Sequence, residues 1–167
     1  EMLTEAKCRD QVEAARRNIA SGKPYNRWIT IAWEKGGADP RHAVKLTGRF
    51  VSEARDWLKV QDSSRLCWQW TQECGPKLGA HVHMLMHIPR HLDPIFRGMP
   101  LRWVKRLLPG PYVSGTLDCR KLQTHQGEGI DPKVAEAIIM GKVRYMLKTG
   151  PAWLEHELGV AHYDGKP

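Results

Sequence analysis

The sequence predicts an α+β fold, in which helices pack on one face of a central and mostly antiparallel β-sheet. Three observations lead to this prediction. The chain has 167 residues, of which 41% are hydrophobic, so it is long enough for one domain with a real core. Segments with strand-like alternation are interspersed with segments whose apolar residues recur at helical spacing. Two neighbouring strand-like segments are joined by a short turn rich in Gly and Pro, as in an antiparallel hairpin.

The predicted elements follow the order helix, strand, helix, strand, strand, helix, strand, helix. The first helix has a basic face and ends at a Ser-Gly-Lys-Pro break, and the last helix starts with a Pro, which suits a first helical turn. A Gly-Met-Pro sequence breaks the third helical segment into one or two short helices. We expect helices at 5–20, 41–59, 92–107 and 132–148, and strands at 27–33, 65–73, 80–88 and 112–123.

Charge and composition limit the function. Lys and Arg total 26 and Asp and Glu total 18, which gives a net charge of +8 and favours a polyanionic partner, most often nucleic acid. No apolar run is long enough to span a bilayer, so we expect a cytoplasmic protein with no membrane partner. The four cysteines form no C-x-x-C pair, which favours reduced thiols over a zinc knuckle or a disulfide framework.

The segment 80–88 places histidines on one face of a predicted strand. Because side chains alternate along a strand, His81, His83 and His87 share a face, and the alternate residues Val82, Met84, Met86 and Ile88 point toward the core. His87 lies further along the strand, and we expect it to contact substrate or to be a surface residue.

The preceding strand adds a carboxylate to this face. A hairpin across 74–80 pairs Glu73 with His81 and Thr71 with His83, and paired side chains point to the same side. One carboxylate and two imidazoles with no obvious fourth ligand are typical of a catalytic metal site with open positions. These ligands suit Mn²⁺ or Mg²⁺ and also accept Zn²⁺ or Co²⁺. Cys74 is a weaker candidate for a fourth, soft ligand.

A second group of candidate residues lies in the last helix. Tyr145 and Lys148 are three positions apart and share a helix face, and Lys142 precedes the tyrosine by the same spacing. A phenol beside two ammonium groups has its anionic form favoured and lies where a phosphate would dock.

These two constellations together resemble the HUH endonucleases, in particular the single-tyrosine initiators of rolling-circle replication. The segments that carry the resemblance are HVHMLMH (81–87), ECGPKLGAHVH (73–83), YMLK (145–148) and, more loosely, WITIAW (28–33). The resemblance covers about 25–150, and it implies an HUH/Rep nuclease-like fold with a ferredoxin-like or RRM-like arrangement. We therefore expect one domain over 1–167, with an N-terminal helix in 1–24, a catalytic core at 25–150 and a C-terminal tail at 151–167. We expect the natural chain to be longer than this sequence.

The resemblance also implies an activity and residue roles. Such proteins nick single-stranded DNA at a replication origin, often in a hairpin, keep the 5′ end as a phosphotyrosine and leave a free 3′-OH for the host replication machinery. Carried over, Tyr145 is the nucleophile and Lys148 assists at the phosphate. Glu73, His81 and His83 become the metal ligands.

DNA binding needs cations and aromatic surfaces. Among the seven tryptophans, parity places Trp68 and Trp70 in the core, and we expect the same of Trp33, Trp103 and Trp153. The residues expected to contact DNA are Lys142, Arg97, Arg102, Lys105, Arg106, Arg120, Lys121 and His87.

Two alternatives remain open from the sequence. A single-tyrosine transposase or a mobilisation relaxase would use the same chemistry, although relaxases usually carry the tyrosine before the histidines. A protein of a different class, a non-catalytic nucleic-acid-binding module with a structural zinc, would need four closed ligands and would not need Tyr145.

Overall fold

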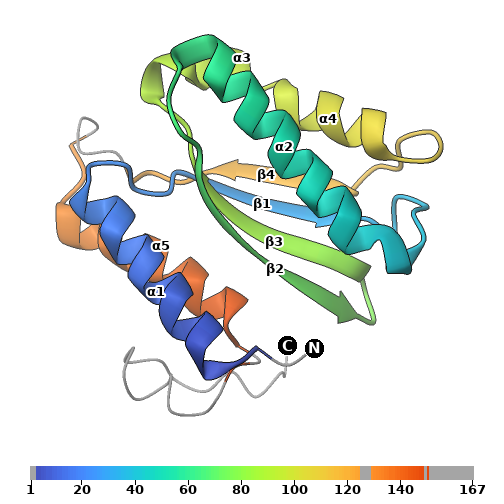
Figure 1. Cartoon of the computed structure of the whole chain (residues 1–167), viewed down its shortest axis with the longest axis horizontal. Coiled ribbons are helices and arrows are strands. Elements are labelled where there is room, and N and C mark those ends of the chain that lie inside the picture. Colours follow the sequence, from blue (N-terminus) through green and yellow to red (C-terminus); the bar gives the residue numbers. More distant parts are fainter. Residues whose placement is uncertain (1–2, 125–128, 149, 151–167) are drawn as a thin grey trace. The chain divides into compact units, whose positions relative to one another are not determined.

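The chain folds around a four-stranded antiparallel sheet, and the predicted α+β class is confirmed (Figure 1). A computed structural model describes residues 3–124, 129–148 and 150. They form two compact units, one spanning Tyr25–Leu122 and the other formed by the described residues of 1–24 and 123–167. The strands of the first unit lie in the order β2-β3-β1-β4, and they are β1 (Arg27–Ala32), β2 (Cys67–Gly75), β3 (Gly79–His87) and β4 (Leu117–Lys121).

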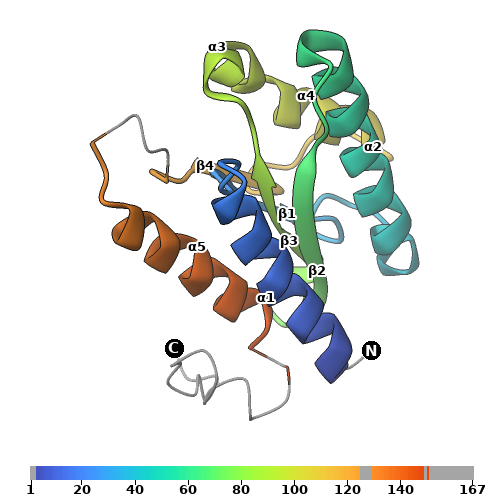
Figure 2. The ribbon, with the colours of Figure 1, turned by 60° about the vertical axis from the view of Figure 1, so that its left-hand side comes forward.

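The helices of the sheet unit separate the strands into a β-α-β-β-α-β order, the split β-α-β arrangement of ferredoxin-like folds. Figures 1 and 2 show α2 and α4 on the same side of the sheet. The expected break near Gly98 is present, because the third helical segment divides before Met99. The helical elements are η1 (Pro40–His42), α2 (Ala43–Asp62), η2 (Arg90–Leu92), α3 (Asp93–Phe96) and α4 (Met99–Leu107).

The core of this unit lies between those helices and one face of the sheet, which we call the helix face. On β3 and β1, every second residue enters this core, as the alternation predicted. From the helices, apolar side chains at helical spacing complete it. The buried strand residues are Ile29, Ile31, Val82, Met84 and Met86, and they pack with Leu46, Phe50, Ala54, Leu58, Phe96, Trp103, Val104 and Leu107.

The second unit contains two helices that pack against one another, α1 (Glu5–Ala20) and α5 (Pro132–Met146). Each helix begins with a side-chain cap, because Thr4 accepts from the backbone N–H of Lys7 and Asp131 accepts from that of Lys133. The first helix has the predicted bounds, whereas the second ends two residues before the expected Lys148.

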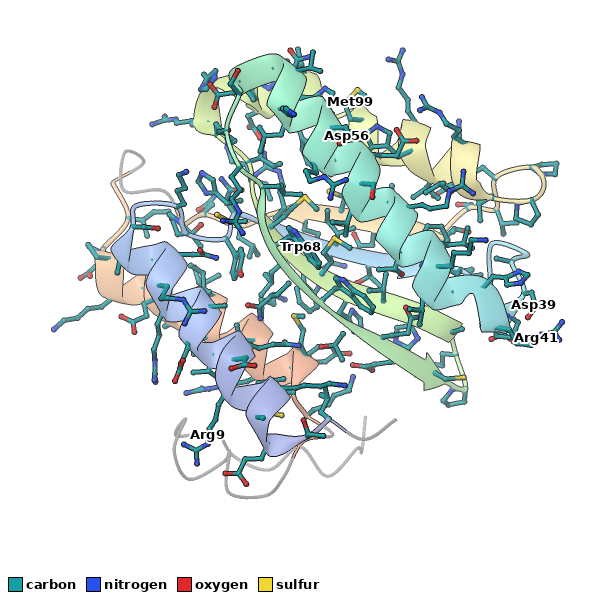
Figure 3. The ribbon with its side chains drawn as sticks, viewed as in Figure 1. Arg9, Asp39, Arg41, Asp56, Trp68 and Met99 are labelled. Atoms are coloured by element: carbon teal, nitrogen blue, oxygen red, sulfur yellow. The ribbon has the colours of Figure 1, made fainter. Side chains whose placement is uncertain are left out.

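The structure corrects two details of the sequence prediction. The fourth strand is shorter than the expected 112–123, because Thr116 donates its backbone N–H to Val113 in a turn, with Gly115 at φ +81°. Trp68 is 41% exposed and does not belong to the core, since β2 is an edge strand (Figure 3). Trp70 is partly buried against the core.

The remaining tryptophan predictions have mixed outcomes. Trp33 and Trp103 are fully buried, as expected. Trp153 lies outside the described residues. Within the part of the chain that the structure describes, none of the helices combines the length and apolarity needed to cross a bilayer.

Candidate metal centre

Glu73, His81 and His83 come together on the face of the sheet opposite the helix face, which we call the histidine face. The β2–β3 register pairs Glu73 with His81 and Thr71 with His83, as predicted. One possible ligand atom from each of Glu73, His81 and His83 lies within 4.8 Å of the other two. His81 Nε2 lies 3.6 Å from Glu73 Oε2. Both histidines are buried, and the glutamate is half-buried.

The ring orientation of His81 is fixed by its own strand. Its Nδ1 lies 2.8 Å from the carbonyl oxygen of Gly79. A carbonyl only accepts, so Nδ1 carries a proton and donates it, and in the neutral ring this leaves the lone pair on Nε2. The nitrogen with the lone pair is therefore the one that faces Glu73, and a cation between these two atoms would be stabilised by both.

His83 is held by two residues of β1. Its Nδ1 lies 3.0 Å from Thr30 Oγ1, and its ring stacks on the Trp28 indole with centroids 5.1 Å apart and planes 10° apart. When Nδ1–H donates to the hydroxyl, Nε2 has the lone pair, as in His81. Sequence reasoning missed these roles of Trp28 and Thr30. The sequence does show that Trp28 and Thr30 share one face of the first strand. Only the β1–β3 register, however, places Thr30 opposite His83.

The residues present fit a divalent cation. One carboxylate and two imidazoles match the nitrogen and oxygen donors that Mn²⁺, Zn²⁺ and Co²⁺ accept, and Mg²⁺ is held by the carboxylate with water and phosphate oxygens. Thr71, which is opposite His83 on the same face, is 6% exposed, and its Oγ1 has no hydrogen-bond partner among the described residues. Leaving such a hydroxyl unsatisfied costs about 1–3 kcal/mol, so a bound ion with its water molecules would relieve a real deficit.

The first residue of β3, at position 79, has to be a glycine. Gly79 has φ +62°, a conformation that residues with a Cβ rarely adopt. A Cβ there would lie 2.3 Å from Glu34 Oε2. The same carboxylate oxygen accepts the backbone N–H of Ala80 at 2.7 Å, so Glu34 holds the start of β3 just before His81.

His87 and Cys74 lie apart from this cluster. His87 is opposite Cys67 on the histidine face and is buried, so the surface alternative for His87 is wrong. The reason is that β3 is an inner strand with a neighbour on each side. Cys74 pairs with Ala80 and is exposed. Its side chain belongs to the helix face and not to the histidine face, which removes it as a fourth ligand.

The structure separates the cations that were expected to contact DNA. Arg120 pairs with Trp28 on the histidine face, where it bonds Asp118 at 2.7 Å. Lys121 has the opposite parity and donates to Asp93 at 3.1 Å. Four further cations of this group are on or next to α4, on the helix-face side, and so are not beside the metal cluster: Arg97, Arg102, Lys105 and Arg106. All four are exposed.

Tyr145 and Lys148 belong to the other unit, at the end of α5. The phenol is 44% exposed, and Lys148 Nζ lies 4.0 Å from the centroid of its ring. The predicted shared face of these two residues is thus present, although Lys148 follows the last helical residue. Lys142 is half-buried one turn earlier.

Comparison with known proteins gives no family. No protein-family model matches the chain, and no curated protein matches it. One similar solved structure is that of the hypothetical protein ORF119 from Sulfolobus islandicus rod-shaped virus 1. The match has 19% sequence identity and a TM-score of 0.44, and it covers 84% of this chain and 93% of that chain. Fold and cluster together define an α+β protein with a candidate metal centre.

Proposed function

We propose that the chain is a metal-dependent endonuclease and strand transferase that nicks and rejoins single-stranded DNA through a phosphotyrosine intermediate. The observation that carries the proposal is the Glu73–His81–His83 cluster, in which both Nδ1 atoms have hydrogen-bond partners within the protein. The resemblance of its motifs to HUH endonucleases supports the same reading. The reaction would initiate rolling-circle replication of a plasmid or phage-like element.

In this reaction Tyr145 is the nucleophile. Its phenolic oxygen forms a bond to the phosphorus of a phosphodiester, the bond from phosphorus to the 3′ oxygen breaks, and the proton lost by the phenol is balanced by one taken up at the 3′ oxygen. The 5′ end stays on the protein, and attack by a 3′-OH reverses the step and joins strands. Lys148, beside the tyrosine ring, would offset the negative charge of the incoming phosphate.

Glu73, His81 and His83 would hold a divalent ion, Mn²⁺ or Mg²⁺, which supplies Lewis-acid polarisation and charge neutralisation at the scissile phosphate. The task of the protein residues is to keep both Nε2 atoms and the carboxylate aimed at one point. Thr30, Trp28 and the Gly79 carbonyl do this for the two rings.

The proposed partner is single-stranded DNA at an origin or hairpin, with the host replication machinery using the 3′-OH. The net charge of +8 supports a polyanionic substrate, and Arg120 is the expected DNA contact on the histidine face. A protein with this role would act in the cytoplasm of the host of such an element.

The structural-zinc alternative has less support. A closed structural zinc site needs four ligands. Among the described residues the cluster offers three, and Cys74 faces the other way. A transposase or relaxase with the same chemistry would share every residue role given above, and the choice between them depends on the DNA substrate.

The proposal is tested by incubating the full chain with a pool of single-stranded and hairpin oligonucleotides and Mn²⁺, and by resolving the products on a denaturing gel. We expect nicking that EDTA abolishes and that His83→Ala and Tyr145→Phe each reduce by at least about 100-fold. Tyr112→Phe is the control for the loss of a tyrosine hydroxyl: it removes the oxygen that accepts the Leu117 N–H in the sheet unit, and once circular dichroism shows the variant folded, its nicking should be unchanged. Nicking that persists in Tyr145→Phe would overturn the assignment of the nucleophile.

A further inference from the structure

A chain of side-chain hydrogen bonds runs through the helix face and ends on the backbone of a metal ligand. Trp33 Nε1–H donates to Thr47 Oγ1 at 2.9 Å. The Thr47 hydroxyl donates to Gln72 Oε1 at 3.2 Å, and Gln72 Nε2 donates to the carbonyl oxygen of His81 at 2.8 Å. The chain thus joins the end of β1, helix α2 and strand β2 to the residue on β3 that carries the imidazole.

The direction of these bonds is fixed by the chemistry of the groups. The indole N–H of Trp33 can only donate, so the Thr47 hydroxyl oxygen accepts and its one proton goes to Gln72. This proton sets the orientation of the Gln72 amide, with Oε1 toward the threonine and Nε2 toward His81. Trp33 and Thr47 are fully buried, so water does not replace a lost partner without cost.

We infer that Thr47 and Gln72 are positioning residues for the metal ligand His81, an inference that rests on the proposed metal centre. His81 is held at two points, because Gln72 binds its carbonyl from the helix face and the Gly79 carbonyl binds its Nδ1. Glu34 holds the intervening Ala80 N–H. With the backbone and the ring both restrained, Nε2 is kept in line with Glu73. Loss of such an outer partner typically weakens metal binding 10–100-fold.

A purely structural role for the hydrogen-bond chain makes a different prediction. In that case Thr47 would matter for folding alone, and the folded variant would bind metal as the natural chain does. Val51 provides the comparison, since it is buried one turn further along α2 but takes no part in the chain of hydrogen bonds. Thr47→Val and Val51→Ala both alter the core packing of α2, and only the first removes the proton that orients Gln72.

The experiment titrates the metal-free full chain with Co²⁺ and with Mn²⁺, at a temperature where circular dichroism shows each variant folded. We expect Thr47→Val to raise the Kd by about 10–100-fold and to change the visible Co²⁺ spectrum. Thr47→Ser, which keeps the hydroxyl, and Val51→Ala should match the natural chain. If Thr47→Val does not fold, Gln72→Leu removes the last donor from a half-buried position on the edge strand and should show the same weakening.

A second readout needs no metal. Carbon NMR of the His81 backbone carbonyl should give the same shift in the natural chain and in Val51→Ala, and a different shift in Thr47→Val, where the Gln72 donor is no longer oriented. Thr47→Val binding that equals Val51→Ala binding, with an unchanged carbonyl shift, overturns the positioning role alone. Failure of the natural chain to bind either ion overturns the metal centre itself, and the positioning role with it.

Discussion

At the scale of single residues, the candidate site depends on which ring nitrogen of each histidine is already bonded within the protein. His81 and His83 each have Nδ1 in a hydrogen bond, to the Gly79 carbonyl and to Thr30 respectively. A histidine of a sheet surface can turn its ring freely, whereas these rings are restrained before any ion arrives. Preorganisation of this kind saves the ordering entropy that metal binding would otherwise cost.

Thr30→Val tests the partner of His83. The variant keeps the shape of the side chain but removes the hydroxyl oxygen at 3.0 Å from Nδ1, so the ring loses the bond that sets its tautomer. We expect a rise of about 10–100-fold in the Kd for Mn²⁺, measured by isothermal titration calorimetry. Thr30→Ser should bind like the natural chain. Equal affinities for the Val and Ser variants would show that Thr30 does not orient His83.

Gly79→Ala tests the turn that precedes His81. A left-handed conformation costs a residue with a Cβ about 1–2 kcal/mol, and here the new Cβ would also meet the Glu34 carboxylate. Gly37→Ala is the matched control, since Gly37 has φ +89° but open space around its Cβ position. Urea denaturation should show the larger loss of unfolding free energy for Gly79→Ala. If the two variants lose the same free energy of unfolding, Glu34 does not restrict the side chain at position 79.

At the scale of elements, the two faces of the sheet carry different cations. Arg120 is on β4 on the histidine face, while Arg102 and Lys105 are on α4 over the helix face. A short single strand bound at the metal cluster would meet Arg120 and not the α4 cations. A longer DNA that reached α4 would meet Arg102 and Lys105 there, since Arg106 is paired with Glu53 at 2.9 Å.

Charge removal on each face checks this division. With a short oligonucleotide, Arg120→Ala should weaken binding and reduce the slope of log K against log salt by about 1, measured by fluorescence anisotropy. The double variant Arg102→Ala/Lys105→Ala should leave that binding unchanged, and it is a stringent control because it removes two positive charges where Arg120→Ala removes one. If the double variant binds the oligonucleotide more weakly than Arg120→Ala does, the DNA lies over the helix face and not over the histidine face.

The hairpin of β2 and β3 was predictable because it depends on local rules. Alternation fixes which residues share a face, and a short turn fixes the register, so Glu73 opposite His81 follows from the sequence. The exposure of Trp68 does not follow, because whether a strand lies at the edge of a sheet is decided by tertiary pairing. The hydrogen-bond chain to His81 through Thr47 could not be predicted either, since the residues that form it are far apart in the sequence.

At the scale of the whole molecule, the core and the candidate metal centre are on opposite faces of one sheet. The buried apolar cluster needs no metal ligand to complete it. Folding should therefore survive metal removal, in contrast to a module built around a structural zinc.

Metal removal tests this separation directly. Circular dichroism in excess EDTA should show the chain folded, and Mn²⁺ at about 100 times its Kd should add about 2.7 kcal/mol of stability. Thermal denaturation with and without Mn²⁺ measures that difference. Unfolding in EDTA alone would favour the zinc-stabilised binding module.

The sequence also predicted the two groups of candidate residues, one on β2 and β3 and one at the end of α5, because each is a short local pattern. The contacts of His83 with Trp28 and Thr30 on β1 could be predicted only from the strand order, which local sequence patterns do not contain. The ion pairs of the surface cations could not be predicted from the sequence either, because Lys121 and Asp93 come together only in the folded sheet unit.

The most direct test of the central claim is the mass of the protein after reaction with single-stranded DNA and Mn²⁺, followed by peptide mapping. The account predicts a DNA-linked species whose modified peptide carries the phosphodiester on Tyr145 and which EDTA prevents. Nicked DNA without any covalent species, or an adduct on another residue, would contradict it.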